Sequence, residues 1–166
     1  PDVSSAASDV YKRQAMYSSP SYDPNKFLFG ISNDDWALIR NNPLKPLVNK
    51  TLSGLYSPGS TIKPIVALSA LENKIVSPSF KVKCTGKMEL YGQTFHCWKE
   101  KGHGFVSLKN AMKQSCDTYF YEVARLLGVD RLNVTAEKFG LGKNVLGDYF
   151  DFEISGLFPN TEWKKY

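Results

Sequence analysis

The chain has 166 residues, the size of one domain, and its content of 42% hydrophobic and 13% aromatic residues is enough to bury a core. Its net charge of +5 is spread along the chain, with no run of Lys and Arg interleaved with aromatic residues, which argues against a nucleic-acid-binding protein. The sequence has no apolar run as long as a membrane span and no signal-peptide pattern at its start.

The first residues of the chain differ from those that follow. Residues 1–14, PDVSSAASDVYKRQ, are small and polar, and they resemble the adapter-derived translations found at the ends of some assembled reading frames. The alternative is an ordinary disordered tail. In either case we expect this leader, non-native or disordered, to carry no function, and we expect the folded part to be residues 15–166.

The segment ahead of the central motif is expected to hold little regular structure. Residues 15–27 are predicted to form a short strand that ends in a cluster of Ser, Pro, Asp and Asn turn residues. Ser32 is then expected to cap a helix that ends before Pro43. Residues 44–55 are predicted to be an extended approach to the motif.

The central motif is YSPGSTIKP, residues 56–64, in which a Pro-Gly turn is followed by Ser60 and Lys63. Pro64 has no N–H and is tolerated only in the first turn of a helix, so the helix is predicted to begin at about Ser60. Side chains three residues apart share a helix face, which places the Lys63 amine within reach of the Ser60 hydroxyl. A serine hydroxyl becomes a nucleophile when an adjacent base takes its proton. We expect Lys63, desolvated by a buried helix, to be that base in its neutral form.

Two alternatives remain at this point. Ser60 could merely cap the helix while Lys63 is a solvated charge. If instead the Asp117 carboxylate lies near Lys63, it favours the charged amine, which then positions other groups while Ser115 or a water moves the proton. The helix itself is predicted to be buried, because apolar residues recur at helical spacing: Ile62, Ile65, Val66, Leu68, Ala70 and Leu71.

The second half of the chain is predicted to combine small hairpins with helices. Residues 80–98 alternate and break at two glycines, which is typical of hairpins. Helices are predicted over residues 107–115, 117–128 and 130–140, the last capped by Asp130. The apolar face of the middle helix is expected to comprise Phe120, Val123, Ala124 and Leu127.

All three cysteines fall in one window with both histidines. An odd number of cysteines cannot pair completely within the chain, so one interpretation is a Cys84–Cys97 disulfide with Cys116 free and buried. The other is a structural zinc site on Cys84, Cys97, His103 and Cys116, because three thiolates and an imidazole make a full tetrahedral shell. The spacing lacks the close Cys-x-x-Cys pair of common zinc folds, so the residue types and not their spacing indicate the metal.

The motifs resemble those of penicillin-binding proteins and serine β-lactamases. The Ser60–Lys63 pair matches their Ser-x-x-Lys motif, and Ser115-Cys116-Asp117 resembles their second motif. The flanking runs LVNKTLSGLYSPGSTIKPIVALSALE, SPSYDPNKF and GHGFVSLKNAMKQSCDTYFYEVARLLG resemble the transpeptidase domain of class B penicillin-binding proteins, in particular the elongation-type penicillin-binding protein 2.

The resemblance implies a fold and a set of roles. The fold is α/β, and residues 15–166 would be the N-terminal half of the transpeptidase domain, mainly its helical subdomain with a small hairpin region, ending before the Lys-Thr-Gly motif. Ser60 would attack the stem peptide, Lys63 would accept its proton, Ser115 would relay a proton and Asp117 would position Lys63 or the substrate. The family more often has Asn at the position of Asp117. Because the third motif is missing, we expect the fragment alone to be inactive.

The resemblance also implies a function and partners. The function is a D,D-transpeptidase that cross-links peptidoglycan stem peptides, at the periplasmic face of the bacterial inner membrane, with no cofactor required besides the possible zinc. Expected partners are stem peptides, lipid-linked precursors, β-lactam antibiotics and a glycosyltransferase of the elongation machinery, and no nucleic acid. The alternatives are a serine β-lactamase or D,D-carboxypeptidase, which pass the acyl group to water, and a non-catalytic β-lactam sensor.

Overall fold

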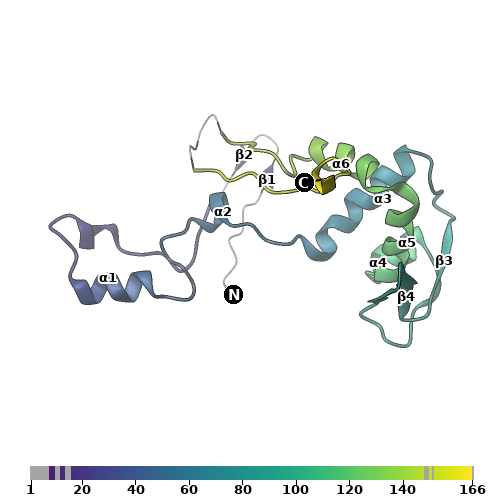
Figure 1. Cartoon of the computed structure of the whole chain (residues 1–166), viewed down its shortest axis with the longest axis horizontal. Helices are drawn as coiled ribbons and strands as arrows, with labels where there is room; N and C mark the ends of the chain where they lie inside the picture. Colours follow the sequence, from purple (N-terminus) through teal and green to yellow (C-terminus); the bar gives the residue numbers. More distant parts are fainter. Residues whose placement is uncertain (1–7, 10–11, 14–15, 148–149, 151, 166) are drawn as a thin grey trace. The chain divides into compact units, whose positions relative to one another are not determined.

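The computed structural model describes residues 8–9, 12–13, 16–147, 150 and 152–165 (Figure 1). The chain divides into two compact units: Pro1–Tyr56 with Asn144–Ile154, and Ser57–Lys143 with Ser155–Tyr166. In the predicted leader, strands β1 (Ser8–Asp9) and β2 (Lys12–Arg13) pair antiparallel, and its other residues lie outside the described part. Within the described residues, no helix has the length and apolar character needed to cross a membrane.

The first unit contains short helices, each begun by a side-chain cap. Residues 16–23 are irregular and lead into the 3₁₀ helix η1 (Pro24–Phe27), so the short strand predicted at the start of this segment is wrong for the residues that are described, whereas the turn predicted after it is present. The cause is local: the Asp23 carboxylate accepts a hydrogen bond from Asn25 N at 2.9 Å, which favours a turn over an extended chain.

Two further helices complete this unit. Helix α1 (Asn33–Arg40) is confirmed, with Ser32 Oγ accepting from Asp35 N at 3.1 Å as a helix cap. The expectation that residues 44–55 are extended is only partly right, because they include the single-turn helix α2 (Lys50–Ser53). Asn49 Oδ1 accepts from Thr51 N at 3.1 Å and so starts that turn.

The second unit is built on three helices that pack together. Helix α3 (Lys63–Glu72) contacts both α5 (Asp117–Leu127) and α6 (Val129–Lys138), and α4 (Leu108–Lys113) lies beside them, with η3 (Trp163–Lys165) near the end of the chain (Figure 1). The core they share includes residues with no exposed surface, among them Ala70, Ala111, Tyr119 and Val123. Helix α5 buries the predicted Phe120, Val123 and Leu127, with Ala124 packed against the core.

The buried face of α3 is only partly the predicted one, because Ile65 and Leu71 are half-buried and Leu68 is exposed. Val66, Ala67 and Ala70 are buried, whereas Leu68, expected inside, is 38% exposed. Ser69 takes the inner place instead: it is fully buried, and its Oγ accepts a hydrogen bond from Thr135 Oγ1 of α6 at 2.8 Å. Small residues on this face let α5 and α6 approach α3 closely, which a pattern of apolar residues alone does not reveal.

Helix α6 begins differently from the prediction. Gly128 is its N-cap, with a φ of +80° that favours glycine, and Asp130 lies within the first turn. The Asp130 carboxylate accepts hydrogen bonds from Thr161 N at 2.8 Å and from Thr161 Oγ1, so it binds the C-terminal segment and does not cap the helix.

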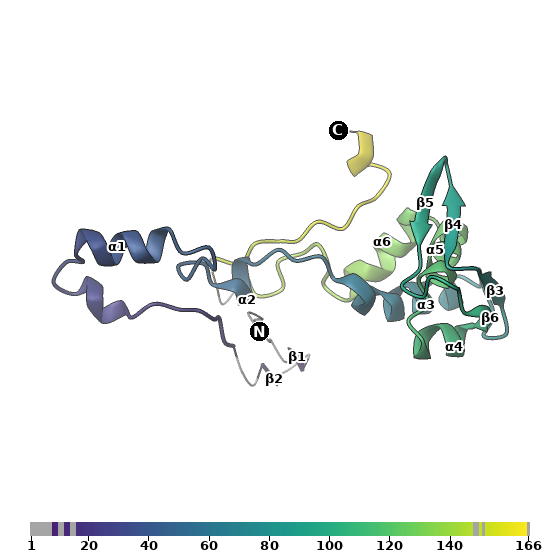
Figure 2. The same ribbon diagram turned by 90° about the horizontal axis from the view of Figure 1, so that it is seen from below.

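Only one of the predicted hairpins is local. Strands β4 (Lys87–Leu90) and β5 (Gln93–His96) form an antiparallel hairpin beside α5 (Figure 2), joined by Tyr91 and Gly92, which both have positive φ as a tight hairpin turn requires. Strand β3 (Lys81–Cys84) instead pairs antiparallel with the more distant β6 (Gly104–Ser107), which places Cys84 opposite Gly104. This pairing brings the end of β3, which carries Cys84, close to the loop before β6, which carries Cys97 and His103.

Candidate active site

Ser60 and Lys63 lie at the start of α3. Ser60 is in the 3₁₀ helix η2 (Gly59–Ile62), and the α-helix begins at Lys63, so the predicted helix start is right although its first turn is 3₁₀. Gly59 has a φ of +55°, which favours glycine and turns the chain so that Ser60 is exposed. Lys63 is 8% exposed, because it enters the core with α3.

Ser115 occupies the junction between α4 and α5. Its φ is +50°, a left-handed conformation that costs a residue other than glycine about 1 to 2 kcal/mol. Cys116, the next residue, donates a hydrogen bond from its backbone N to Ala111 O of α4 at 2.9 Å. Helix α5 then starts at Asp117. The strained turn therefore points Ser115 and Asp117 toward the first turn of α3.

The four predicted residues form one continuous set of contacts. Lys63 Nζ donates to Ser115 O and to Ser115 Oγ, both at 2.9 Å, and to Asp117 Oδ1 at 2.6 Å. Ser115 Oγ donates to Ser60 Oγ at 3.1 Å, so Ser115 stands between the serine and the lysine. The three acceptors match the three N–H groups of an ammonium. These contacts describe the charged lysine, and the neutral base stays a prediction.

The lysine and the aspartate are an ion pair at the edge of the core. Their side chains are 10% and 21% exposed, and the Lys63 ammonium lies 5.7 Å from the centroid of the Phe120 ring. Burial opposes ionisation of Asp117, but hydrogen bonds from Lys63 and from Trp98 N, together with the lysine charge, outweigh it and lower the pKa of this carboxyl. Asp117 therefore stays charged and holds Lys63 in place.

An open cavity of about 600 Å³ adjoins these residues. Ser60 and Ser115 line it together with Trp98, which sequence reasoning missed. Trp98 N donates to Asp117 Oδ2 at 3.0 Å, and Trp98 Nε1 donates to Gln114 O at 3.0 Å. In the sequence, the indication that Trp98 belongs to the site was its position directly after Cys97. Only the fold shows that its side chain reaches the turn that carries Ser115.

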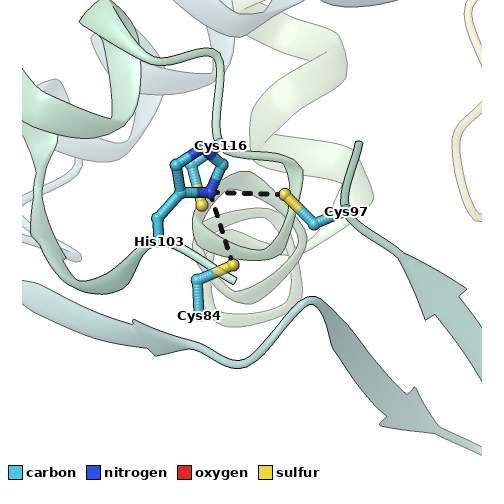
Figure 3. A group of neighbouring side chains, drawn as sticks. All are labelled: Cys84, Cys97, His103 and Cys116. Atoms are coloured by element: carbon cyan, nitrogen blue, oxygen red, sulfur yellow. Dashed lines mark hydrogen bonds between the residues drawn. The ribbon is translucent and has the colours of Figure 1, made fainter. Parts of the chain in front are cut away.

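The structure also brings the four predicted metal ligands together. Cys84 ends β3, Cys97 follows β5, His103 precedes β6 and Cys116 is the N-cap of α5, and their side chains point toward one another (Figure 3). Their ligand atoms all lie within 4.8 Å of one another, and His103 Nδ1 is 3.6 Å from the sulfur atoms of both Cys84 and Cys97. All three cysteines are buried free thiols, without the alternative Cys84–Cys97 disulfide, and His96 is not in the group.

The thiols differ in their environments. Burial opposes ionisation of Cys84, but hydrogen bonding, which includes the contact with His103 Nδ1, lowers the pKa of this thiol to about 6. Burial raises the pKa of Cys116 to about 12. The group thus holds one thiol that ionises readily beside one whose burial opposes ionisation.

A family model for the penicillin binding protein transpeptidase domain matches residues 10–165, and the chain belongs to this family. The mixed helical and small-sheet structure is a fragment of that α/β fold, as predicted.

Several known proteins are similar to the chain. The peptidoglycan D,D-transpeptidase MrdA of Acinetobacter baumannii is 41% identical over 152 residues, which is 90% of this chain and 22% of that protein. A crystal structure of Pseudomonas aeruginosa PBP2 in complex with WCK 5153 matches with a TM-score of 0.82 and 45% identity, over 90% of this chain and 34% of that one. A complex of PBP2 and MreC from Helicobacter pylori matches with a TM-score of 0.79 and 31% identity, over 90% and 28%. The chain thus spans about a fifth of the length of the first of these relatives.

Proposed function

We propose that the protein containing this chain is a peptidoglycan D,D-transpeptidase that works through an acyl-enzyme on Ser60. The observation that carries the proposal is the unbroken hydrogen-bond series from Ser60 through Ser115 to Lys63, at 3.1 and 2.9 Å, beside an open cavity. The names of its relatives, peptidoglycan D,D-transpeptidase among them, support the choice of a cell-wall peptide as substrate.

In the proposed acylation step, Ser115 carries the proton between Ser60 and Lys63. When Lys63 is neutral, its two N–H groups donate to Ser115 O and Asp117 Oδ1. Its lone pair then accepts from the Ser115 hydroxyl, which lies 2.9 Å from Lys63 Nζ. Ser115 then gives its proton to Lys63 and takes the proton of Ser60 as the Ser60 oxygen attacks the carbonyl between the terminal D-alanines. This differs from direct transfer to Lys63, because Ser115 lies between the two.

The acyl-enzyme then passes its acyl group to an amine. Lys63, now charged, returns its proton through Ser115 to the leaving nitrogen, and D-alanine departs. The amine of a second stem peptide attacks the ester on Ser60 and forms the cross-link. Its proton passes to Lys63 and through Ser115 to the leaving Ser60 oxygen, whereas a β-lactam leaves the ester in place. Asp117, where the family more often has Asn, keeps Lys63 near Ser115 through its 2.6 Å ion pair.

The setting of this activity is proposed from the relatives. The substrates are stem peptides and lipid-linked precursors at the periplasmic face of the inner membrane. The partner is a glycosyltransferase of the elongation machinery, and the structural match to a PBP2 bound to MreC supports a place in such an assembly. Acyl transfer to and from Ser60 is proposed to require no cofactor.

We also propose that Cys84, Cys97, His103 and Cys116 hold a structural zinc ion. Zn–S bonds of about 2.3 Å and Zn–N bonds of about 2.0 Å give a tetrahedral S···N edge of roughly 3.5 Å. The two S···N distances from His103 Nδ1 are 3.6 Å, and all four groups are at least partly buried. Three thiolates and one imidazole fill the shell and leave no open position, so the ion would act on structure.

The proposed ion would stabilise the loops that carry the active site. Cys116 lies between Ser115 and Asp117, and Cys97 precedes Trp98, whose N–H donates to Asp117. Ligation would tie both chain segments together and so hold the Asp117 carboxylate against Lys63.

Covalent labelling tests the proposed function. The whole transpeptidase that contains this chain is expected to be labelled by a fluorescent penicillin, and the label should disappear in Ser60→Ala. The matched control is Ser57→Ala, an exposed serine of the same segment, which should keep the label. A label that persists in Ser60→Ala would remove Ser60 as the nucleophile.

A further inference from the structure

Another cavity, of about 280 Å³, is lined by residues of strands β3 and β4 and of helix α5. It shares no lining residue with the cavity beside Ser60, and it includes none of the four proposed zinc ligands. Its apolar part consists of Phe80, Val82 and Met88, which are all half-buried. Water in contact with such a surface is released when an aliphatic side chain takes its place, so the cavity favours an apolar group.

Both strands that line this cavity have an edge without a strand partner. In the described part of the chain, β3 pairs only with β6 and β4 pairs only with β5 (Figure 2). No described residue of β5 or β6 lines the cavity, which therefore adjoins the unpaired edges. A free strand edge presents backbone N–H and C=O groups that a further strand can bond, while a neighbouring pocket takes its alternate side chains.

The edge of β3 also carries positive charge. Lys81 and Lys83 are both exposed and both line the cavity. In the described part of the chain, neither lysine has a carboxylate within ion-pair distance. The carboxylate that lines the cavity, Glu122, is already bound by the Arg125 guanidinium at 2.7 and 2.8 Å. The charge therefore attracts an acidic ligand and repels a second copy of the same edge.

We propose that the edge of β3 binds an extended segment of a partner protein in which acidic and aliphatic residues alternate. Successive side chains of a strand point to opposite faces, and side chains opposite each other on neighbouring strands share a face. The acids of the segment therefore lie beside Lys81 and Lys83, and its aliphatic side chains lie beside Val82 and enter the cavity. The segment adds a third strand to the β3–β6 pair. This inference goes beyond the proposed function, because it assigns an interaction surface apart from Ser60.

Peptide binding to the whole transpeptidase tests the pattern of side chains. The probe is the fluorescein-labelled peptide Thr-Glu-Val-Glu-Val-Glu-Thr, and binding is followed by fluorescence anisotropy. We expect this peptide to bind about fivefold more tightly than the same peptide with Gln in place of Glu, the range of two solvent-exposed ion pairs. Replacing each Val of the peptide by Ala should weaken binding by up to about tenfold, because fewer apolar atoms leave water.

Methylation of the peptide backbone tests whether the segment binds as a strand. Alternate amide nitrogens of a strand face the same edge, so two further peptides are N-methylated at the odd and at the even positions. At least one of them should lose binding, because its N–H groups toward the edge of β3 are gone. Retained binding by both peptides would rule out strand pairing.

Lysine variants test where the peptide binds. Lys81→Gln combined with Lys83→Gln should remove the preference for Glu over Gln in the peptide. The matched control is Lys101→Gln combined with Lys109→Gln, two exposed lysines that do not line the cavity, and it should keep the preference. The peptide variants need no change to the protein, so they decide the proposal even where a lysine variant is less stable.

Three results would overturn the proposed surface. They are the absence of saturable binding by the acidic peptide, equal binding of the Glu and Gln peptides, and a preference for Glu that survives the loss of both lysines. A β3 edge that the rest of the transpeptidase already covers gives the first result and so counts against a partner. Penicillin labelling at Ser60 tests the proposed function separately, since the peptide measurements involve no acylation.

Discussion

Removing the Ser115 hydroxyl is the sharpest test of the proton route. Ser115→Ala deletes both the 3.1 Å contact with Ser60 and the 2.9 Å contact with Lys63, while its backbone carbonyl still accepts from Lys63. A side chain that transfers a proton in the rate-limiting step contributes about 10²- to 10⁴-fold. We therefore expect the second-order rate of acylation by a penicillin, measured on the whole transpeptidase, to fall by about that factor.

A second substitution at the same place separates the hydroxyl from the backbone strain. The φ of +50° costs Ser and Ala about 1 to 2 kcal/mol and costs glycine almost nothing, although glycine loses up to about 1 kcal/mol through its freer unfolded chain. Ser115→Gly should therefore be about as stable as Ser115→Ala or up to roughly 1 kcal/mol more stable in thermal unfolding. Both variants should lose acylation equally. Acylation near the wild-type rate in either variant, or recovery in the glycine variant alone, would refute the relay through Ser115.

The remaining predictions concern the metal and the core. The whole transpeptidase, produced in the periplasm, should contain about one zinc ion per chain by elemental analysis, and His103→Ala should lose the zinc and lower the melting temperature. Zinc-free protein with a single free thiol would instead establish the Cys84–Cys97 disulfide. Ala70→Leu, at a fully buried position of α3, should destabilise the protein by about 1 to 3 kcal/mol in denaturant unfolding, because a larger side chain overpacks the core there. Leu68→Ala, at a 38% exposed position, should cost clearly less, and a larger cost there would mean that the buried face of α3 has been misassigned.

Several features could be predicted because neighbouring residues determine them. Ser32 caps α1 through a hydrogen bond to the backbone three residues on, and Gly59 turns the chain just before Ser60. The Tyr91-Gly92 turn joins β4 to β5. Each depends on contacts within a few residues, which the order of amino acids encodes directly. The Ser-x-x-Lys spacing belongs to this group, and with its flanking runs it indicated the family that the comparisons show.

Other features depend on contacts between distant segments, and these the sequence left open or predicted wrongly. Strand β3 pairs with β6 and not with its neighbour, and Ser69 takes an inward place on α3 because Thr135 of α6 meets it. The residue types of Cys84, Cys97, His103 and Cys116 indicated a metal shell, but only the β3–β6 pairing and the start of α5 bring their side chains together.

The sequence by itself indicated the groups that we propose for the chemistry, since Ser60, Lys63, Ser115 and Asp117 stand in local patterns of defined spacing. The tertiary structure decided their order in space. Ser115 lies between Ser60 and Lys63 because the left-handed turn after α4 meets the first turn of α3, and Trp98 joins the site through the backbone of another loop. These contacts span 19 to 55 residues along the chain, and at such separations packing and hydrogen bonding, not local spacing, set the geometry.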